Sequence, residues 1–344
     1  MKNYFSLKLS LDFIKFFLWL FAIFFIFTFL TKNKDVIFPL FRNICLNENT
    51  FVLIAILIIL YAIYLTLFSS AFYILMKHKK IKSGLLEAVI INLKSMLWGN
   101  IPGGIWNHIG YFTFSKEAIE KNHQNKNLTI TNKEIALLPV QNLIFSVMAI
   151  SILSLISFIF MIIFDHNSIK VLAPVIKQPW YMYGFLLSLI LILAFIITRY
   201  KDFLNKKLAF LKKIFVNKTF VIKTVAIYFL ALIFFVASFV TIYYLLVGPD
   251  KFNISFLPKL YFAYTFSWLV GFLAIPFPGG LGIREWTFSM VFQDELPVAI
   301  GFSIMLLHRV FIIFMQISLF VVLMLWLKIR KYIANKKNNG VSFI

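Results

Sequence analysis

The sequence has 344 residues, of which 61% are hydrophobic and 43 are phenylalanine, and its mean hydropathy is +0.90. Soluble globular domains are about half apolar, so this composition excludes that class and indicates an integral membrane protein. In so apolar a chain, the net charge of +21 is better explained by membrane topology and anionic lipid headgroups than by nucleic acid. The single cysteine, Cys45, excludes an internal disulfide and a cysteine metal cluster, and we expect neither a metal nor a cofactor.

Six apolar runs are long enough to cross about 30 Å of hydrocarbon as helices. The first follows a basic segment without a small-residue cleavage pattern, so we expect a retained helix rather than a signal peptide. Two further apolar regions, 85–115 and 259–293, contain Pro and Gly at their centres, which predicts broken, re-entrant helical hairpins. The sequence therefore predicts an all-α polytopic membrane protein, with spans at residues 13–30, 51–76, 136–164, 180–198, 224–247 and 298–327.

Basic residues are distributed unevenly between the two sides of this layout. If the N-terminus is cytoplasmic, the cytoplasmic segments carry 23 Lys and Arg residues, whereas the segments on the other side carry 6. Positively charged loops favour the cytoplasmic side, so we expect a multi-pass protein of the cytoplasmic membrane with both termini inside. The number of basic residues on each side is the same whether a broken region is re-entrant or crosses the membrane twice, so both possibilities stay open.

The predicted elements repeat in the two halves of the chain. Residues 1–170 contain two spans, a broken hairpin and a third span, and residues 171–344 repeat that order. Each half has an odd number of crossings, so the second is inverted relative to the first. NIPGGIWNHIGYF (100–112) aligns with PFPGGLGIREWTF (276–288), which places His108 against Arg284. Secondary transporters use such inverted repeats to form a binding site near the bilayer midplane.

Proline and glycine explain why the helices would break in these two segments. Proline removes a backbone donor and clashes with the preceding turn, whereas glycine permits a sharp reversal. A tight turn outside the membrane is the alternative for either segment alone. A helix restarting near Gly282 would point its N-terminal amides at an anion such as phosphate. The residues expected to form the two reversals are Pro102, Gly103, Gly104, Pro276, Pro278, Gly279, Gly280 and Gly282.

Polar and ionisable side chains near the breaks are candidate substrate-binding residues, because such residues within membrane spans are usually functional. Arg284 has a planar fork suited to phosphate oxygens. Glu285 is expected to be a counter-ion of Arg284 or a proton carrier, and a snorkelling arginine beside a solvated glutamate is the alternative. Arg309 in the last span is expected to share the ligand or to pair with Glu285. The other candidates, in the first hairpin, are Asn107, His108 and Lys94.

These segments resemble the transmembrane domain of the lysylphosphatidylglycerol synthetase (flippase domain) family. The most specific element is P-x-PGG-x-G-x-R-E, beginning at Pro276, and Arg309 in LLHRVFIIF matches the arginine of the last span. The resemblance covers most of the chain in layout and implies a lipid translocase that moves anionic or modified lipids, or lipid-linked glycans, between leaflets. Some members carry a cytosolic aminoacyl transferase domain after the membrane part. None follows here before Ile344, so we expect a different substrate.

Hydrolase, metalloprotease and nucleotide-binding motifs are absent from the sequence. We therefore expect a non-enzymatic flippase-like transporter of a phosphate-bearing lipid, either a phospholipid or a polyprenyl-phosphate-linked glycan, and no nucleic-acid partner. One alternative is an integral-membrane transferase acting on a lipid phosphate, with Glu285 or His108 as general base. The other is a non-transporting partner of an envelope glycan synthase.

Overall fold

The computed structural model describes residues 50–99, 106–123, 131–164, 217–248, 252–273 and 280–338, and a few single positions between 28 and 39. These residues form helices and turns, and none of them lies in a β-strand. Four helices contain segments long and apolar enough to cross a membrane: α3 (Thr50–His78), α6 (Asn132–Phe164), α10 (Lys218–Val247) and α13 (Val298–Asn338). The prediction of an apolar, all-helical membrane protein is confirmed to that extent. The spans predicted at 13–30 and 180–198 lie outside the described residues.

Local capping explains where two of these helices begin. At the start of α6, the Glu134 carboxylate accepts the Thr131 N–H at 3.0 Å, and the Thr131 hydroxyl oxygen accepts the Glu134 N–H at 3.4 Å. This reciprocal arrangement satisfies two backbone donors at a helix start. At the start of α10, the Asn217 side chain accepts the Phe220 N–H at 3.0 Å. The capping groups thus start both helices before their apolar runs, four to six residues earlier than predicted from hydropathy.

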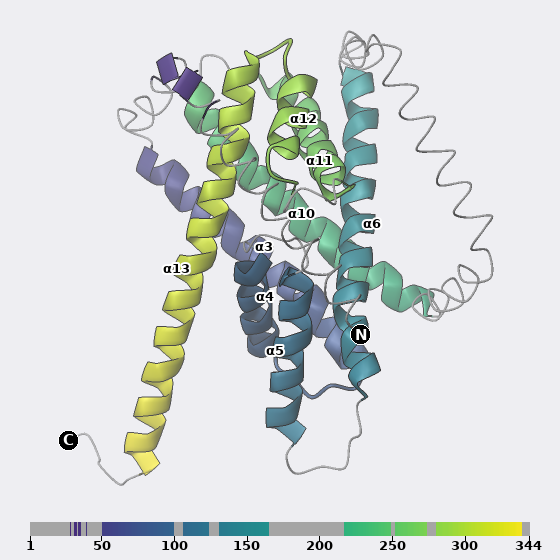
Figure 1. Ribbon diagram of the computed structural model, residues 1–344, viewed down its shortest axis with the longest axis vertical. Coiled ribbons are helices and arrows are strands. Elements are labelled where there is room, and N and C mark those ends of the chain that lie inside the picture. Colours follow the sequence, from purple (N-terminus) through teal and green to yellow (C-terminus); the bar gives the residue numbers. More distant parts are fainter. Residues whose placement is uncertain are drawn as a thin grey trace, which may run out of the picture.

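Two helical hairpins lie between the long helices. The first consists of α4 (Leu85–Gly99) and α5 (Trp106–His123), and the second of α11 (Leu257–Leu273), which follows the short helix η3 (Ile254–Phe256), and α12 (Ile283–Val291). The two helices of each hairpin pack on one another. The first hairpin occupies the lower half of the molecule in Figure 1 and the second occupies the upper half. With nine residues, α12 is only about 14 Å long, half the thickness of the hydrocarbon core.

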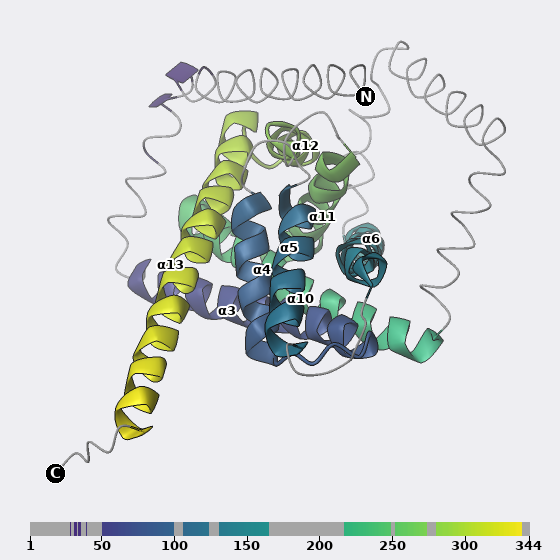
Figure 2. The same ribbon diagram turned by 60° about the horizontal axis from the view of Figure 1, so that its bottom comes forward.

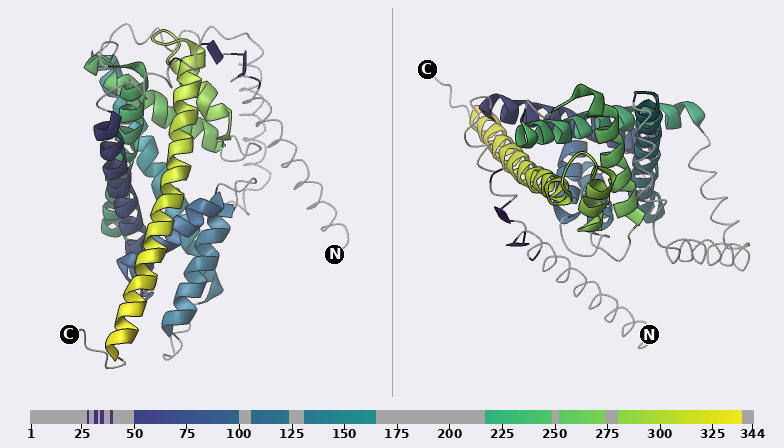
Figure 3. Two further views of the ribbon diagram at one scale, coloured as in Figure 1. Left: turned by 90° about the vertical axis from the view of Figure 1, so that its left-hand side faces the viewer. Right: turned by 90° about the horizontal axis from the view of Figure 1, so that it is seen from above.

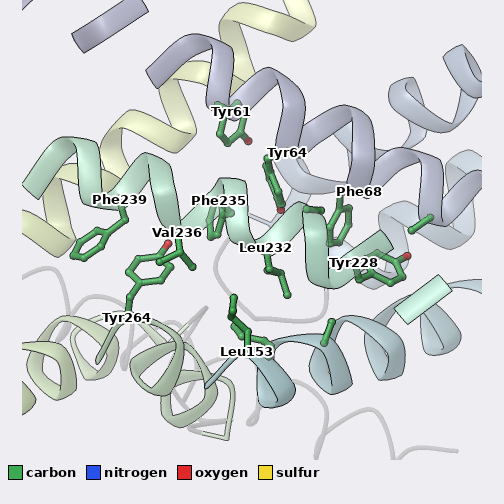
Figure 4. Packing of buried hydrophobic residues seen from close by; sticks show 14 of the residues in the cluster. Tyr61, Tyr64, Phe68, Leu153, Tyr228, Leu232, Phe235, Val236, Phe239 and Tyr264 are labelled. Atoms are coloured by element: carbon green, nitrogen blue, oxygen red, sulfur yellow. The ribbon is translucent and has the colours of Figure 1, made fainter. Parts of the chain in front are cut away.

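Helices α3 and α10 pack along each other and form the centre of the bundle. They run side by side in Figures 1 and 2, and the left view of Figure 3 shows them on one side of both hairpins. Aromatic rings fill their interface, which Figure 4 shows in detail. The rings of Tyr64 and Phe235 are 4.6 Å apart between centroids, and those of Phe68 and Tyr228 are 4.9 Å apart. Such tilted and edge-on ring pairs add to the energy of apolar burial.

A chain of buried amide and hydroxyl groups links five helices across the bundle. The Asn92 amide of α4 donates to the Ser69 hydroxyl of α3 at 2.7 Å, and the Tyr111 hydroxyl of α5 donates to the Asn92 carbonyl oxygen. Tyr111 also interacts with Asn142 of α6, whose carbonyl oxygen accepts from the Tyr228 hydroxyl of α10. Inside a membrane the hydrophobic effect does not drive helices together, so such hydrogen bonds help to fix their relative positions.

Helix α13 extends well beyond its contacts with the bundle. The apolar run predicts an end near residue 327, but the helix continues through the following basic residues to Asn338. Its lower part stands apart from the other described helices in Figures 1 and 2. The exposed residues there include Val322, Leu325, Trp326 and Ile329. This apolar surface is suited to lipid rather than water.

We expect Tyr228→Phe to lower the free energy of unfolding by about 1–2 kcal/mol, because the Asn142 carbonyl oxygen loses its donor in a buried site. The change is measured as a lower thermal unfolding midpoint in detergent. Tyr73→Phe is the matched control, since Tyr73 is a half-buried tyrosine of α3 outside this hydrogen-bond chain. An equal loss in both variants would contradict a specific role for the chain.

Candidate functional site

The reversal between α11 and α12 depends on two glycines with positive φ. Gly280 has φ +67° and Gly282 has φ +83°, a backbone region that L side chains rarely adopt. A Cβ on Gly280 would also lie 2.6 Å from the Gly271 carbonyl oxygen, so the returning chain touches the backbone of α11. The other residues expected to form the reversals, Pro102, Gly103, Gly104, Pro276, Pro278 and Gly279, lie outside the described residues.

Arg284, in the first turn of α12, folds back onto α11. Its guanidinium carbon lies 3.6 Å from the centre of the Trp268 ring, which is a close cation–π stack. The arginine stem fills the space left by Gly271, where an added Cβ would lie 2.2 Å from the Arg284 Cγ. The Arg284 Nε is buried, and no hydrogen-bond acceptor for it is found within the described ranges. The cation is therefore held by an aromatic face while one donor still requires an acceptor.

Glu285 connects the start of α12 to α13. Its side chain is only 1% exposed; Oε2 accepts the Gly282 N–H at 2.7 Å, and Oε1 accepts from the Arg309 Nη1 at 3.2 Å. The expected pair between Arg309 and Glu285 is thus present. The bond to Gly282 is one half of a capping box, because glycine has no side chain for the other half. The N-terminus of α12 therefore already has an anion from its own first turn.

Of the two guanidinium groups near this carboxylate, only that of Arg309 pairs with it directly. Arg284 interacts electrostatically with both Arg309 and Glu285, so the three charges form one cluster. Two positive groups and one negative group leave this cluster with an excess of one positive charge. Burial strengthens such interactions and favours the arrival of a further anion. We refer to Arg284, Glu285 and Arg309 below as the charged cluster.

His308 lies beside the charged cluster, and sequence reasoning assigned it no role. The side chain is buried, with Nε2 3.1 Å from the Ser238 hydroxyl and Nδ1 3.2 Å from the Tyr264 hydroxyl. The rings of Phe235 and Phe239 surround it. Both ring nitrogens are engaged, so His308 joins α13 to α10 and α11. Its position next to Arg309 within an apolar span was the only signal available in the sequence.

The candidates of the first hairpin form a separate group. The Lys94 ammonium lies 4.9 Å from the centre of the Phe114 ring, and His108 is half-buried on α5. Asn107 packs against Gly99, where an added Cβ would lie 3.1 Å from its own Cβ. Among the described residues, these three make no hydrogen bond or ion pair with the charged cluster. Each hairpin thus has its own polar group.

Comparison of the chain with protein-family models, with curated proteins and with solved structures finds no match. The function of the site is therefore inferred from its side chains, their contacts and the helices that carry them.

We expect Gly271→Ala to displace Arg284 from Trp268 and to lower the free energy of unfolding by about 1–3 kcal/mol through overpacking. In an Arg284→Ala background the same substitution should cost much less, because the clashing atoms are gone. Thermal unfolding of the four proteins of this double-mutant cycle measures the coupling. Gly84→Ala is the control, since no atom lies within 4 Å of an added Cβ there. Equal costs with and without the arginine would contradict the packing described.

Proposed function

We propose that this protein is a flippase-like transporter that moves a phosphate-bearing lipid across the cytoplasmic membrane. The observation that carries the proposal is the charged cluster within an apolar helical bundle, with two guanidinium groups and a single carboxylate. Guanidinium forks bind phosphate oxygens in pairs, and phosphate is the anionic group common to the lipid candidates. The resemblance to the flippase-domain family points the same way, for a phospholipid or a polyprenyl-phosphate-linked glycan.

The architecture supports an inverted repeat with two re-entrant hairpins and six spans. The described helices fall into the same order twice, α3 to α6 and α10 to α13, and the two hairpins occupy opposite ends of the bundle in Figures 1 and 3. In such a repeat α11 corresponds to α4, and α6 corresponds to α13. Both matching contacts are present, since α11 packs on α6 and α4 packs on α13. A helix as short as α12 cannot cross the hydrocarbon core by itself. A hairpin that enters the membrane and returns to the same side accommodates such a short helix. In this arrangement the N- and C-termini are cytoplasmic, as the basic residues favour.

In this proposal the Glu285 carboxylate occupies the place that the lipid phosphate takes when it binds. Its carboxylate occupies the N-terminus of α12 and one face of Arg309, where a phosphate would find both an amide donor and a guanidinium. An incoming phosphate competes with this carboxylate for Arg309 and provides an acceptor for the Arg284 Nε. Release reverses the exchange, so neither cation loses all its partners during the cycle. This favours the counter-ion role of Glu285 over that of general base, because both of its oxygens are engaged.

We expect Arg284→Ala to reduce lipid translocation by roughly 10- to 150-fold. The reason is that the phosphate loses charge-assisted hydrogen bonds worth about 1.5–3 kcal/mol. The assay follows fluorescent phosphatidylglycerol and a short-chain polyprenyl phosphate between the leaflets of liposomes. Arg330→Ala is the matched control, because Arg330 also lies over a tryptophan, Trp326, but on the exposed part of α13. Unchanged movement in Arg284→Ala, or no movement of either lipid by the parent protein, would refute the proposal.

We expect Glu285→Gln to tighten lipid phosphate binding by roughly tenfold, because Arg309 loses a competing charge-assisted hydrogen bond of about 1.5 kcal/mol while the acceptor for Gly282 remains. Translocation should slow, because the phosphate is then released less readily. Equilibrium binding of fluorescent phosphatidylglycerol to the solubilised protein measures the first effect, and the liposome assay measures the second. Glu295→Gln is the control, since Glu295 pairs with Lys259 at 2.8 Å away from this carboxylate. Weaker binding in Glu285→Gln would show that Glu285 does not compete with the ligand.

A further inference from the structure

The first hairpin contains a group of buried polar atoms that the proposed phosphate site does not use. Ser95 on α4 and Ser115 on α5 have no exposed surface, and Gln141 on α6 is only 3% exposed. The hydroxyls of the two serines, the Gln141 Oε1 and the Asn107 Oδ1 have no hydrogen-bond partner in the part of the chain that the structure describes. Each such atom costs about 1–3 kcal/mol if it stays unpaired. Four of them in neighbouring helices therefore call for a further hydrogen-bonding partner.

Their spacing places three polar side chains in one row. Asn107, Tyr111 and Ser115 follow each other at intervals of four residues, so they share one face of α5. Ser95 faces the same helix from α4, since a Cβ added to Gly110 would lie 3.3 Å from its hydroxyl oxygen. The row thus follows the seam between α4 and α5, the two adjacent helices at the lower centre of Figure 1.

The row also meets the chain of amides and hydroxyls that crosses the bundle. Tyr111 belongs to both, because its hydroxyl donates to Asn92 and interacts with Asn142. Asn142 is followed along the bundle by Tyr228, and it neighbours Gln141 in the sequence of α6. Apart from Tyr228 on α10, the satisfied and unsatisfied polar groups therefore lie on α5 and on the two helices packed against it, α4 and α6, and every group named is uncharged.

We infer that a hydrated path runs along the seam of α4 and α5, with water bonded to Ser95, Asn107, Ser115 and Gln141. Water fits because each molecule takes two to four polar partners and needs little space. A lipid headgroup does not fit, because Gly110 approaches Ser95 within van der Waals contact. The path lets water enter from the end of the bundle where α5 terminates and reach Asn107 in the first turn of α5. This inference concerns water and does not require that the protein transports lipid.

Cysteine accessibility tests the path directly. Replacement of the single native cysteine by Cys45→Ala provides the background, into which Ser95→Cys and Ser115→Cys are introduced separately. The silver ion, a thiol reagent about as small as a water molecule, is applied in chloride-free buffer to each side of sealed vesicles in turn. We expect both cysteines to react from one side only, at least about tenfold faster than a cysteine in a dry site, where the reactive thiolate is suppressed. The control is Ala149→Cys, at a fully buried position in the apolar core of α6.

Two results would overturn the inference. One is a reaction at Ser95→Cys and Ser115→Cys that is no faster than at Ala149→Cys from either side, which would mean that the seam is dry. The other is fast reaction at all three positions, which would mean general opening of the bundle. Thermal unfolding checks that each variant is folded, and either serine position decides the question if the other variant is unstable. No lipid substrate enters this readout, so its result is separate from that of the translocation assay.

Discussion

The second half of the molecule depends on one buried carboxylate. Glu285 accepts a backbone N–H at the start of α12 and a guanidinium N–H from α13, and it is almost completely shielded from solvent. In an apolar surrounding both donors would be costly without it. The short helix α12 makes few other polar contacts among the described residues, so this carboxylate sets where the helix begins. That position in turn aims Arg284 at the face of Trp268.

The polar contacts that join the helices differ in chemistry between the two halves of the chain. In the first half the helices are joined by neutral amides and hydroxyls, of which Asn92, Tyr111 and Asn142 form the centre. In the second half, arginine, glutamate and histidine have that role. Neutral hydrogen bonds hold helices without attracting ions, whereas an excess of guanidinium attracts anions. The two halves thus share an order of helices but differ in charge, and the charged cluster belongs to the second half.

Hydropathy was sufficient to predict the described long helices, because it depends on local sequence. The helix ends were less predictable. Helix α5 continues to His123 through a polar segment in which Lys116 and Glu120 pair one turn apart, a contact that hydropathy does not register. The partners within the amide–hydroxyl chain were not predicted, since they are 19 to 86 residues apart in the sequence. Trp268 and Gly271 were missed for the same reason, because an arginine does not reveal its distant stacking partner.

The length of α13 has a consequence for how deep the charged cluster lies. Its 41 residues rise about 62 Å, twice the thickness of a hydrocarbon core. Exposed tryptophan and arginine side chains, here Trp326 and Arg330, prefer the level of the lipid headgroups. Arg309 stands about 26 Å of helix rise above Trp326 and so approaches the opposite membrane surface. The charged cluster is therefore shallow on one side of the bilayer, and the first hairpin lies toward the opposite end of the bundle.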